Sequence, residues 1–176
     1  MSPNPDALDL LKADHDKVKE MFAKYDTLGD RAMVGKKDLA GRICRELTVH
    51  AHIEEQVFYP RVREAGRQIK DEVLEGLEEH HLIKHAVAEL EPLTPENERY
   101  DAKVEVLKEL VEHHVDEEEA DMFPRVRKAL DAKELEELGA AMEAARASAP
   151  THVDPDSPDE PTAAGAQSGG TAGSAR

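Results

Sequence analysis

The chain has 176 residues, and its 23 Lys and Arg against 39 Asp and Glu give a formal net charge of -16 at pH 7. This charge opposes binding to a phosphate backbone or an anionic membrane surface, so nucleic acid and membranes are not expected partners. The sequence has no run of about 18 apolar residues and no amino-terminal signal pattern, which predicts a cytoplasmic protein. A single cysteine, Cys44, excludes an internal disulfide, and its place beside Ile43 predicts a core residue.

Apolar residues at steps of three and four predict five helices. In chain order, their apolar faces run from Leu8 to Phe22, from Leu39 to Phe58, from Leu74 to Ala88, from Val104 to Met122 and, more weakly, from Leu135 to Met142. Pro60 and Pro124 should kink the second and fourth helices or open their last turns. Four long helices with short connections predict an all-α, up-down-up-down four-helix bundle with a short fifth helix, over residues 1–147.

The last part of the chain has a different composition. From Ser148 onward it is rich in Pro, Gly, Ala, Ser and Asp and has almost no large apolar residues. Such a segment cannot offset its ordering entropy by burial, which predicts a disordered tail over residues 148–176.

A near-repeat links the second and fourth helices. The two copies read HAHIEEQVFYPRV at residues 50–62 and HHVDEEEADMFPRV at residues 113–126. Aligning the prolines pairs His50 with His114 and Glu54 with Glu118. The first and third helices repeat more weakly, as LKADH at residues 11–15 and LEEHH at residues 77–81. The duplication predicts a pseudo-twofold bundle whose four helices face one centre.

Histidine and glutamate side chains occupy core positions of these helices. A buried His or Glu needs a cation or another polar partner. Carboxylates can bridge two cations and imidazole is a ligand of iron, zinc, copper and nickel, so the pattern predicts a two-metal site with an oxo or hydroxo bridge, and its nitrogen and oxygen ligands favour iron. The predicted ligands are five imidazoles and two carboxylates: His15, His50, Glu54, His81, His85, His114 and Glu118.

The two halves differ at one predicted ligand, because His85 corresponds to Lys19. With Glu54, Glu118 and the oxo or hydroxo group as three bridges, the metal ion bound by His81, His85 and His114 has six ligands. The other metal ion, bound by His15 and His50, has five. The open position is predicted to bind a small molecule.

Neighbouring residues offer other assignments. His52, His80 and His113 lie roughly 100° to 200° from the chosen faces and are predicted to face solvent. His113 with Glu118 is an alternative register of the fourth helix, which the repeat disfavours. Three further carboxylates are predicted to lie at the surface or behind the ligands: Glu55, Glu117 and Glu119.

The motifs resemble those of the hemerythrin-like (HHE cation-binding) family over about residues 5–147. The resemblance rests on one ordered set: His15, His50-x-x-x-Glu54, His81-x-x-x-His85 and His114-x-x-x-Glu118. It implies a four-helix bundle around a non-haem di-iron site that binds or reacts with O2, peroxide or nitric oxide. Oxygen-carrying members close the last helix with His-x-x-x-x-Asp, whereas this chain has His-x-x-x-Glu, which speaks against simple reversible oxygen carriage.

Other functions stay open at the level of sequence. Peroxide decomposition by a catalase-like reaction would make the protein an enzyme. Ferritin-like iron oxidation or storage needs two Glu-x-x-His motifs, and the bundle carries only Glu78-x-x-His81. A purely structural acidic bundle would keep its melting temperature after chelation. The sequence does not determine the oligomeric state.

Overall fold

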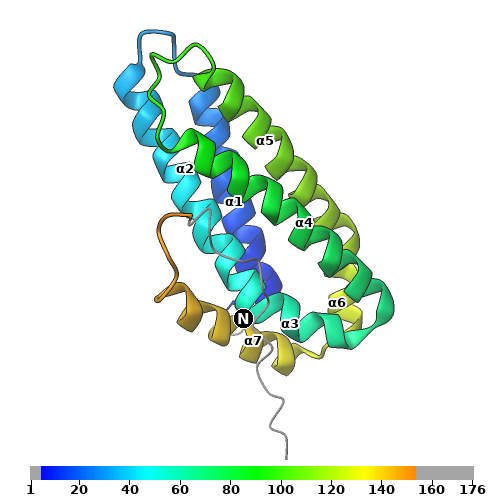
Figure 1. The fold of residues 1–176 in the computed structure, drawn as a ribbon. Helices are drawn as coiled ribbons and strands as arrows, with labels where there is room; N and C mark the ends of the chain where they lie inside the picture. Colours follow the sequence, from blue (N-terminus) through cyan, green and yellow to red (C-terminus); the bar gives the residue numbers. More distant parts are fainter. Residues whose placement is uncertain (1–4, 154–176) are drawn as a thin grey trace, which may run out of the picture.

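Two antiparallel helix pairs form the body of the protein, and a shorter helix lies across one end (Figure 1). The structure, a computed structural model, describes residues 5–153, and it contains no strand in that range. The first pair is α1 (Ala7–Asp26) with α2 (Met33–Ile53), and the second is α4 (Arg67–Leu90) with α5 (Tyr100–Glu117). The predicted all-α bundle is confirmed.

Each motif-bearing helix continues past its glutamate through a π-helical turn. After α2 come η1 (Glu54–Phe58), α3 (Tyr59–Val62) and the 3-10 turn η2 (Arg63–Ala65); after α5 come η3 (Glu118–Met122) and α6 (Phe123–Ala129). The predicted kinks at Pro60 and Pro124 take this form. A proline ring inside a regular helix would clash with the carbonyl group four residues earlier, and a wider turn relieves that clash. Tyr59 N–H accordingly donates to Glu54 O, five residues back.

Side-chain hydrogen bonds cap the amino-terminal ends of the first and the fifth predicted helix. The Asp6 side chain accepts a hydrogen bond from Asp9 N–H at 3.0 Å, which caps α1. Asp131 and Glu134 form a reciprocal capping box at the start of α7 (Ala132–Arg146). The short fifth helix is therefore confirmed, and it packs against α1, α2 and η1.

Two apolar clusters fill the interior. One contains Val18, Leu47, Ile83 and Val111, and the other contains Leu11, Phe58, Val73 and Met122. Cys44 is 1% exposed in the first cluster, as predicted. The buried His and Glu residues lie at positions between these clusters along α1, α2, α4 and α5. Apolar side chains therefore enclose the polar centre on both sides along the bundle axis.

None of the helices within residues 5–153 is long and apolar enough to cross a membrane. The predicted disordered tail, residues 148–176, lies largely outside the described range.

Candidate metal centre

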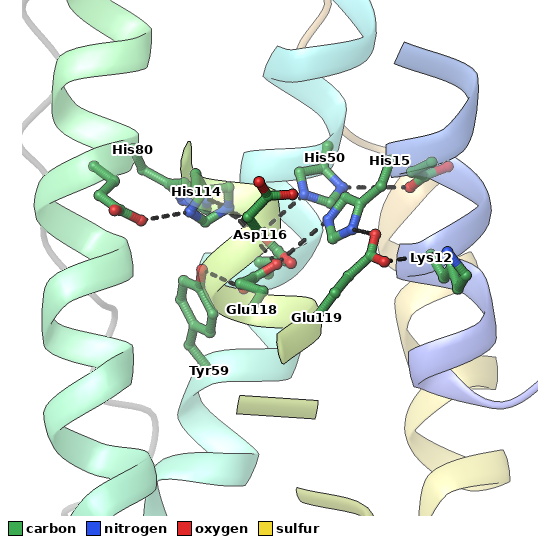
Figure 2. Close-up of polar contacts among 12 residues, drawn as sticks. Lys12, His15, His50, Tyr59, His80, His114, Asp116, Glu118 and Glu119 are labelled. Atoms are coloured by element: carbon green, nitrogen blue, oxygen red, sulfur yellow. Dashed lines mark hydrogen bonds and ion pairs between the residues drawn. The ribbon is translucent and has the colours of Figure 1, made fainter. Parts of the chain in front are cut away.

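Six buried side chains from four helical segments converge in the middle of the bundle (Figure 2). They form two groups that share one carboxylate: His15, His50, Glu54 and Glu118 in the first, and Glu54, His80 and His114 in the second. Within each group the nitrogen and oxygen atoms lie within 4.8 Å of one another. Each of the six is at most 6% exposed, so solvent does not satisfy them.

The two glutamates lie between the imidazole rings. Glu54 Oε2 is 3.2 Å from His50 Nε2, 3.1 Å from His80 Nε2 and 3.9 Å from His114 Nε2. Glu118 Oε2 is 3.3 Å from His15 Nε2 and 3.6 Å from His114 Nε2. Both carboxylates are therefore close to rings of both halves of the duplicated bundle.

Several of these atoms have no hydrogen-bond partner within the described part of the chain: His15 Nε2, both ring nitrogens of His50, both oxygens of Glu54 and Glu118 Oε2. Their neighbours are near enough for ion pairing but are not aligned for hydrogen bonds. A buried polar atom without a partner costs about 1 to 3 kcal/mol, and more when it is charged. A cation between the rings and carboxylates removes this cost, so the residues fit bound metal ions.

An outer layer of carboxylates faces the far nitrogen of each ring. His15 Nδ1 is 3.0 Å from Glu119, His80 Nδ1 2.9 Å from Glu55, His114 Nδ1 2.7 Å from Glu79 and His50 Nδ1 3.6 Å from Asp14. Contacts of this kind fix the ring orientation and turn Nε2 toward the centre. Basic side chains in turn hold three of the carboxylates, through the pairs Lys12–Glu119, Lys84–Glu55 and Arg146–Asp14.

The outer layer follows the internal duplication. Asp14 and Glu79 each precede a histidine of the first helix of their pair, and each contacts the histidine of the second helix. Glu55 and Glu119 each follow a motif glutamate and contact a histidine of the other half. Of the two places predicted for Glu55 and Glu119, the surface or behind the ligands, these contacts agree with the second.

This symmetry corrects the predicted register of the third long helix. The counterpart of His15 is His80, which is 2% exposed, whereas His81 and His85 are exposed. The prediction that His81 and His85 face the centre, and that His80 faces solvent, is wrong. The buried face of α4 runs through Val73, Gly76, His80, Ile83 and Val87, and the exposed Leu74 had suggested a different face.

The corrected register also removes the predicted difference between the halves. Four residues after His15 and His80 stand Lys19 and Lys84, so both halves carry lysine there. The open coordination position inferred from His85 opposite Lys19 therefore has no basis. Among the other histidines, His113 is exposed as predicted, and His52 is half-buried outside both groups.

At the centre itself, the two halves differ at a tyrosine that is not among the predicted ligands. The Tyr59 hydroxyl donates a hydrogen bond of 2.8 Å to Glu118 Oε1 (Figure 2). Its counterpart in the repeat, Phe123, stacks on His15 with ring centroids 5.8 Å apart. Gly76 makes room, since a Cβ atom there would lie 2.7 Å from the Tyr59 hydroxyl. The pairing of Tyr59 with Phe123 inside an otherwise close repeat is the sequence feature that could have revealed this difference.

Charge pairing sets the protonation of the centre without metal. Burial lowers the pKa of His50, but the charge of Glu54 and contacts with Asp14 and Glu54 outweigh it and raise that pKa to about 10. Burial likewise opposes ionisation of Glu54, and the charge of His50 with close contacts to the three nearby imidazole rings holds the pKa of Glu54 well below its usual range. Burial and the charge of Glu118 raise the pKa of Tyr59 well above its ordinary value, so its hydroxyl keeps its proton.

Comparison with known proteins points to one family. The family model described as the hemerythrin HHE cation binding domain matches residues 6–126. The solved structure of a hemerythrin HHE cation binding domain-containing protein from Mycobacterium kansasii is similar, with a TM-score of 0.68 and 27% identity, over 82% of this chain and 89% of that one. An uncharacterized protein of Mycobacterium tuberculosis is 30% identical over 142 residues, 78% of this chain and 83% of that protein.

Two further relatives are longer than the matched region. A DNA nickase of a Nostoc species is 28% identical over 138 residues, which are 78% of this chain but 38% of that protein. An uncharacterized hemerythrin-like protein of Schizosaccharomyces pombe is 27% identical over 117 residues, 66% of this chain and 58% of that protein. The chain thus spans less than two thirds of either relative.

Proposed function

The chain belongs to the hemerythrin HHE cation-binding family, and from that premise we propose that it is a non-haem di-iron protein that binds or reacts with O2, peroxide or nitric oxide. The observation that carries the proposal is the set of buried nitrogen and oxygen atoms without hydrogen-bond partners at the centre of the described bundle. The proposed cofactor is a pair of iron ions with an oxo or hydroxo bridge.

The ligand chemistry supports iron. His15, His50, Glu54 and Glu118 would hold one ion, and His80 and His114 with Glu54 would hold the other. A mixture of imidazole nitrogen and carboxylate oxygen suits iron, whereas structural zinc prefers four ligands and often thiolates. When bound, two iron ions supply the one-electron redox chemistry that O2, peroxide and nitric oxide require.

A small cavity beside the imidazole rings supports a small reactant. Its volume is about 20 Å³, enough for a molecule the size of water. All four ring histidines line it, together with apolar side chains that include Val18, Leu47 and Ile83. Apolar walls favour a diatomic molecule or peroxide over a larger or charged substrate.

The chain's own groups prepare the centre for such a reaction. The outer carboxylates hold the rings with Nε2 inward, and the apolar clusters exclude bulk water. Tyr59 holds a proton at its hydroxyl oxygen against Glu118. This hydrogen bond fixes the orientation of the Glu118 carboxylate, a proposed metal ligand.

Two alternatives have less support. Glu78 and His81, the Glu-x-x-His pair expected for ferritin-like iron oxidation, are both exposed on α4. The DNA nickase activity in the name of the Nostoc relative belongs to a protein of which this chain spans 38%. The net charge of -16 opposes nucleic acid, so we retain the expectation that nucleic acid is not a partner. A cytoplasmic location also stays an expectation.

Exposure of the iron-loaded protein to each small molecule tests the proposal. Full-length chain loaded with Fe(II) without oxygen should change its visible absorption on mixing with O2, peroxide or nitric oxide. The change should be absent in Glu54→Ala, which removes the shared carboxylate. Reversal on removal of O2 would indicate a carrier or sensor, and repeated peroxide consumption would indicate an enzyme. No spectral change with any of the three would contradict the proposal.

A further inference from the structure

An acidic cavity on the second helix pair is lined by carboxylates that include Glu118 of the buried centre. It has a volume of about 220 Å³ and lies between α4, α5 and η3. The carboxylates that line it are Glu72, Glu75, Glu79, Glu117, Glu118 and Asp121. Arg125 is the one basic residue in this described lining, and it pairs with Glu72 and Asp121. The lining therefore keeps a strong excess of negative charge.

The inner end of the cavity reaches a proposed metal ligand. Glu118 lines the cavity, is 2% exposed and belongs to the first group of converging side chains. Its Oε2 has no hydrogen-bond partner within residues 5–153. A cation that travelled along this cavity would therefore arrive at a carboxylate with one oxygen, Oε2, that lacks a partner.

A third group of possible ligands consists of Glu79 and Glu117, which line the same cavity, and of His113 beside them. His113 Nε2 is 3.4 Å from Glu79 Oε1 and 3.3 Å from Glu117 Oε1, and the three residues together can offer ligand atoms within 4.8 Å of one another. His113 is 65% exposed, so the group is open to solvent. The other oxygen of Glu79 is 2.7 Å from His114 Nδ1, so one carboxylate contacts both this group and the centre.

The internal duplication provides a comparison within the chain. The positions of the first half that correspond to Glu72, Glu75, Glu117 and Asp121 are Ala7, Leu10, Ile53 and Val57. That half is covered by α7, which packs against α1, α2 and η1. The counterpart of His113 is Val49. Carboxylates and a histidine thus occur in the half that α7 leaves uncovered, where an ion could enter.

We propose that Glu79, His113 and Glu117 bind a divalent metal ion at the surface and that the acidic cavity leads this ion to Glu118 and the buried centre. The inference rests on the proposed metal centre. Two carboxylates and one imidazole suit Fe(II), Mn(II) or Co(II). A cleft lined by one sign of charge raises the local concentration of counter-ions and their rate of entry, by roughly 10-fold to 1,000-fold at low salt.

The test uses Co(II) as a probe, because it has visible absorption and does not require oxygen-free handling for loading. The variant His113→Asn/Glu117→Gln removes two ligands without touching the six central residues. The matched control Glu78→Gln/His81→Asn makes the same chemical changes at exposed positions of α4 outside the cavity. Stopped-flow absorbance gives the loading rate of the metal-free chain, and equilibrium titration gives the number and affinity of bound ions.

Wild type and control should bind two ions tightly and a third more weakly. The His113→Asn/Glu117→Gln variant should keep the two tight ions, lose the third and load roughly tenfold more slowly at low ionic strength, and added salt should reduce the difference. Glu54→Gln should lose tight binding and keep the weak ion, which separates this inference from the metal centre itself. A variant with the rate and the third ion of wild type would overturn the inference, and so would loss of a tight ion.

Discussion

The packing of Tyr59 against Gly76 offers a test of how the two halves of the centre differ. Gly76→Ala places a Cβ atom 2.7 Å from the Tyr59 hydroxyl and 3.2 Å from its Cζ atom. The Tyr59 ring is 1% exposed and cannot move outward without displacing core residues. The methyl group must therefore push the ring away from Glu118 or strain the helix.

The expected cost follows from two contributions. Overpacking a buried site costs about 1 to 3 kcal/mol. Loss of the hydrogen bond from Tyr59 to the buried Glu118 costs about 1 to 3 kcal/mol as well. We expect Gly76→Ala to lower the free energy of unfolding by about 3 kcal/mol, which for a domain of this size lowers Tm by about 6 to 12 °C.

Thermal and urea unfolding of the metal-free chain measure this cost, with Gly41→Ala as the control. A Cβ at Gly41, inside α2, meets no atom within 4 Å, so alanine there should stabilise by up to about 1 kcal/mol. Tyr59→Phe combined with Gly76→Ala should cost less than the sum of the single changes, because Phe lacks the clashing hydroxyl. Additive costs, or a Gly76→Ala variant as stable as wild type, would refute the packing argument.

Three further changes test other contacts. His80→Asn should weaken binding of the second metal ion by about 100-fold or more, whereas His81→Asn should leave metal binding unchanged; equal effects in a metal titration would refute the corrected register. Asp101→Asn should destabilise by about 1 kcal/mol in urea unfolding, because the buried Lys36 ammonium group lies 2.6 Å from Asp101, whose own side chain is 59% exposed and partly screened by solvent. Lys36 lowers the pKa of Asp101, so the contribution is complete above the unfolded pKa of about 3.9 and is lost as pH falls through the folded pKa. A difference from wild type that does not shrink as pH falls below 3.9 would contradict this. Gly139→Ala should loosen α7 and lower Tm, since its Cβ would lie 2.9 Å from a backbone oxygen before α1; an unchanged Tm would show that the segments separate freely.

The fold was predictable because local patterns agree with tertiary packing. Leu, Val and Ile recur at helical spacing in every long segment, and the two prolines mark equivalent points in α2 and α5 and their continuations. Alignment on Pro60 and Pro124 placed His50, Glu54, His114 and Glu118 correctly on inward faces. The sequence could not distinguish a kink from a π-helical turn, since both relieve the same clash.

The predicted register of α4 was wrong for a physical reason. His80 and His81 are adjacent, and Leu74 and Leu82 lie outside the core at 45% and 52% exposure, so apolar spacing points to the wrong face. The buried face includes Gly76, which has no side chain to reveal its position. Aligning Asp14-His15 with Glu79-His80, a carboxylate followed by a histidine in each case, gives the correct register.

Other features depend on contacts between distant segments. Glu55 contacts His80 across 25 residues, and Glu119 contacts His15 across 104 residues. Glu117 follows His113 by four residues on α5, which the sequence shows, but its place beside Glu79 and the acidic cavity depends on the packing of α4 against α5. Pairings of this kind require the three-dimensional arrangement.

Iron stoichiometry tests the central claim most directly. The full-length chain should be loaded with excess Fe(II) without oxygen, passed through a desalting column, and analysed for iron and protein. We expect two retained iron ions per chain in wild type and in Glu55→Gln, and loss of iron in Glu54→Ala and Glu118→Ala. Retention of one iron or none by the wild-type chain would contradict a centre in which Glu54 is shared by two metal ions.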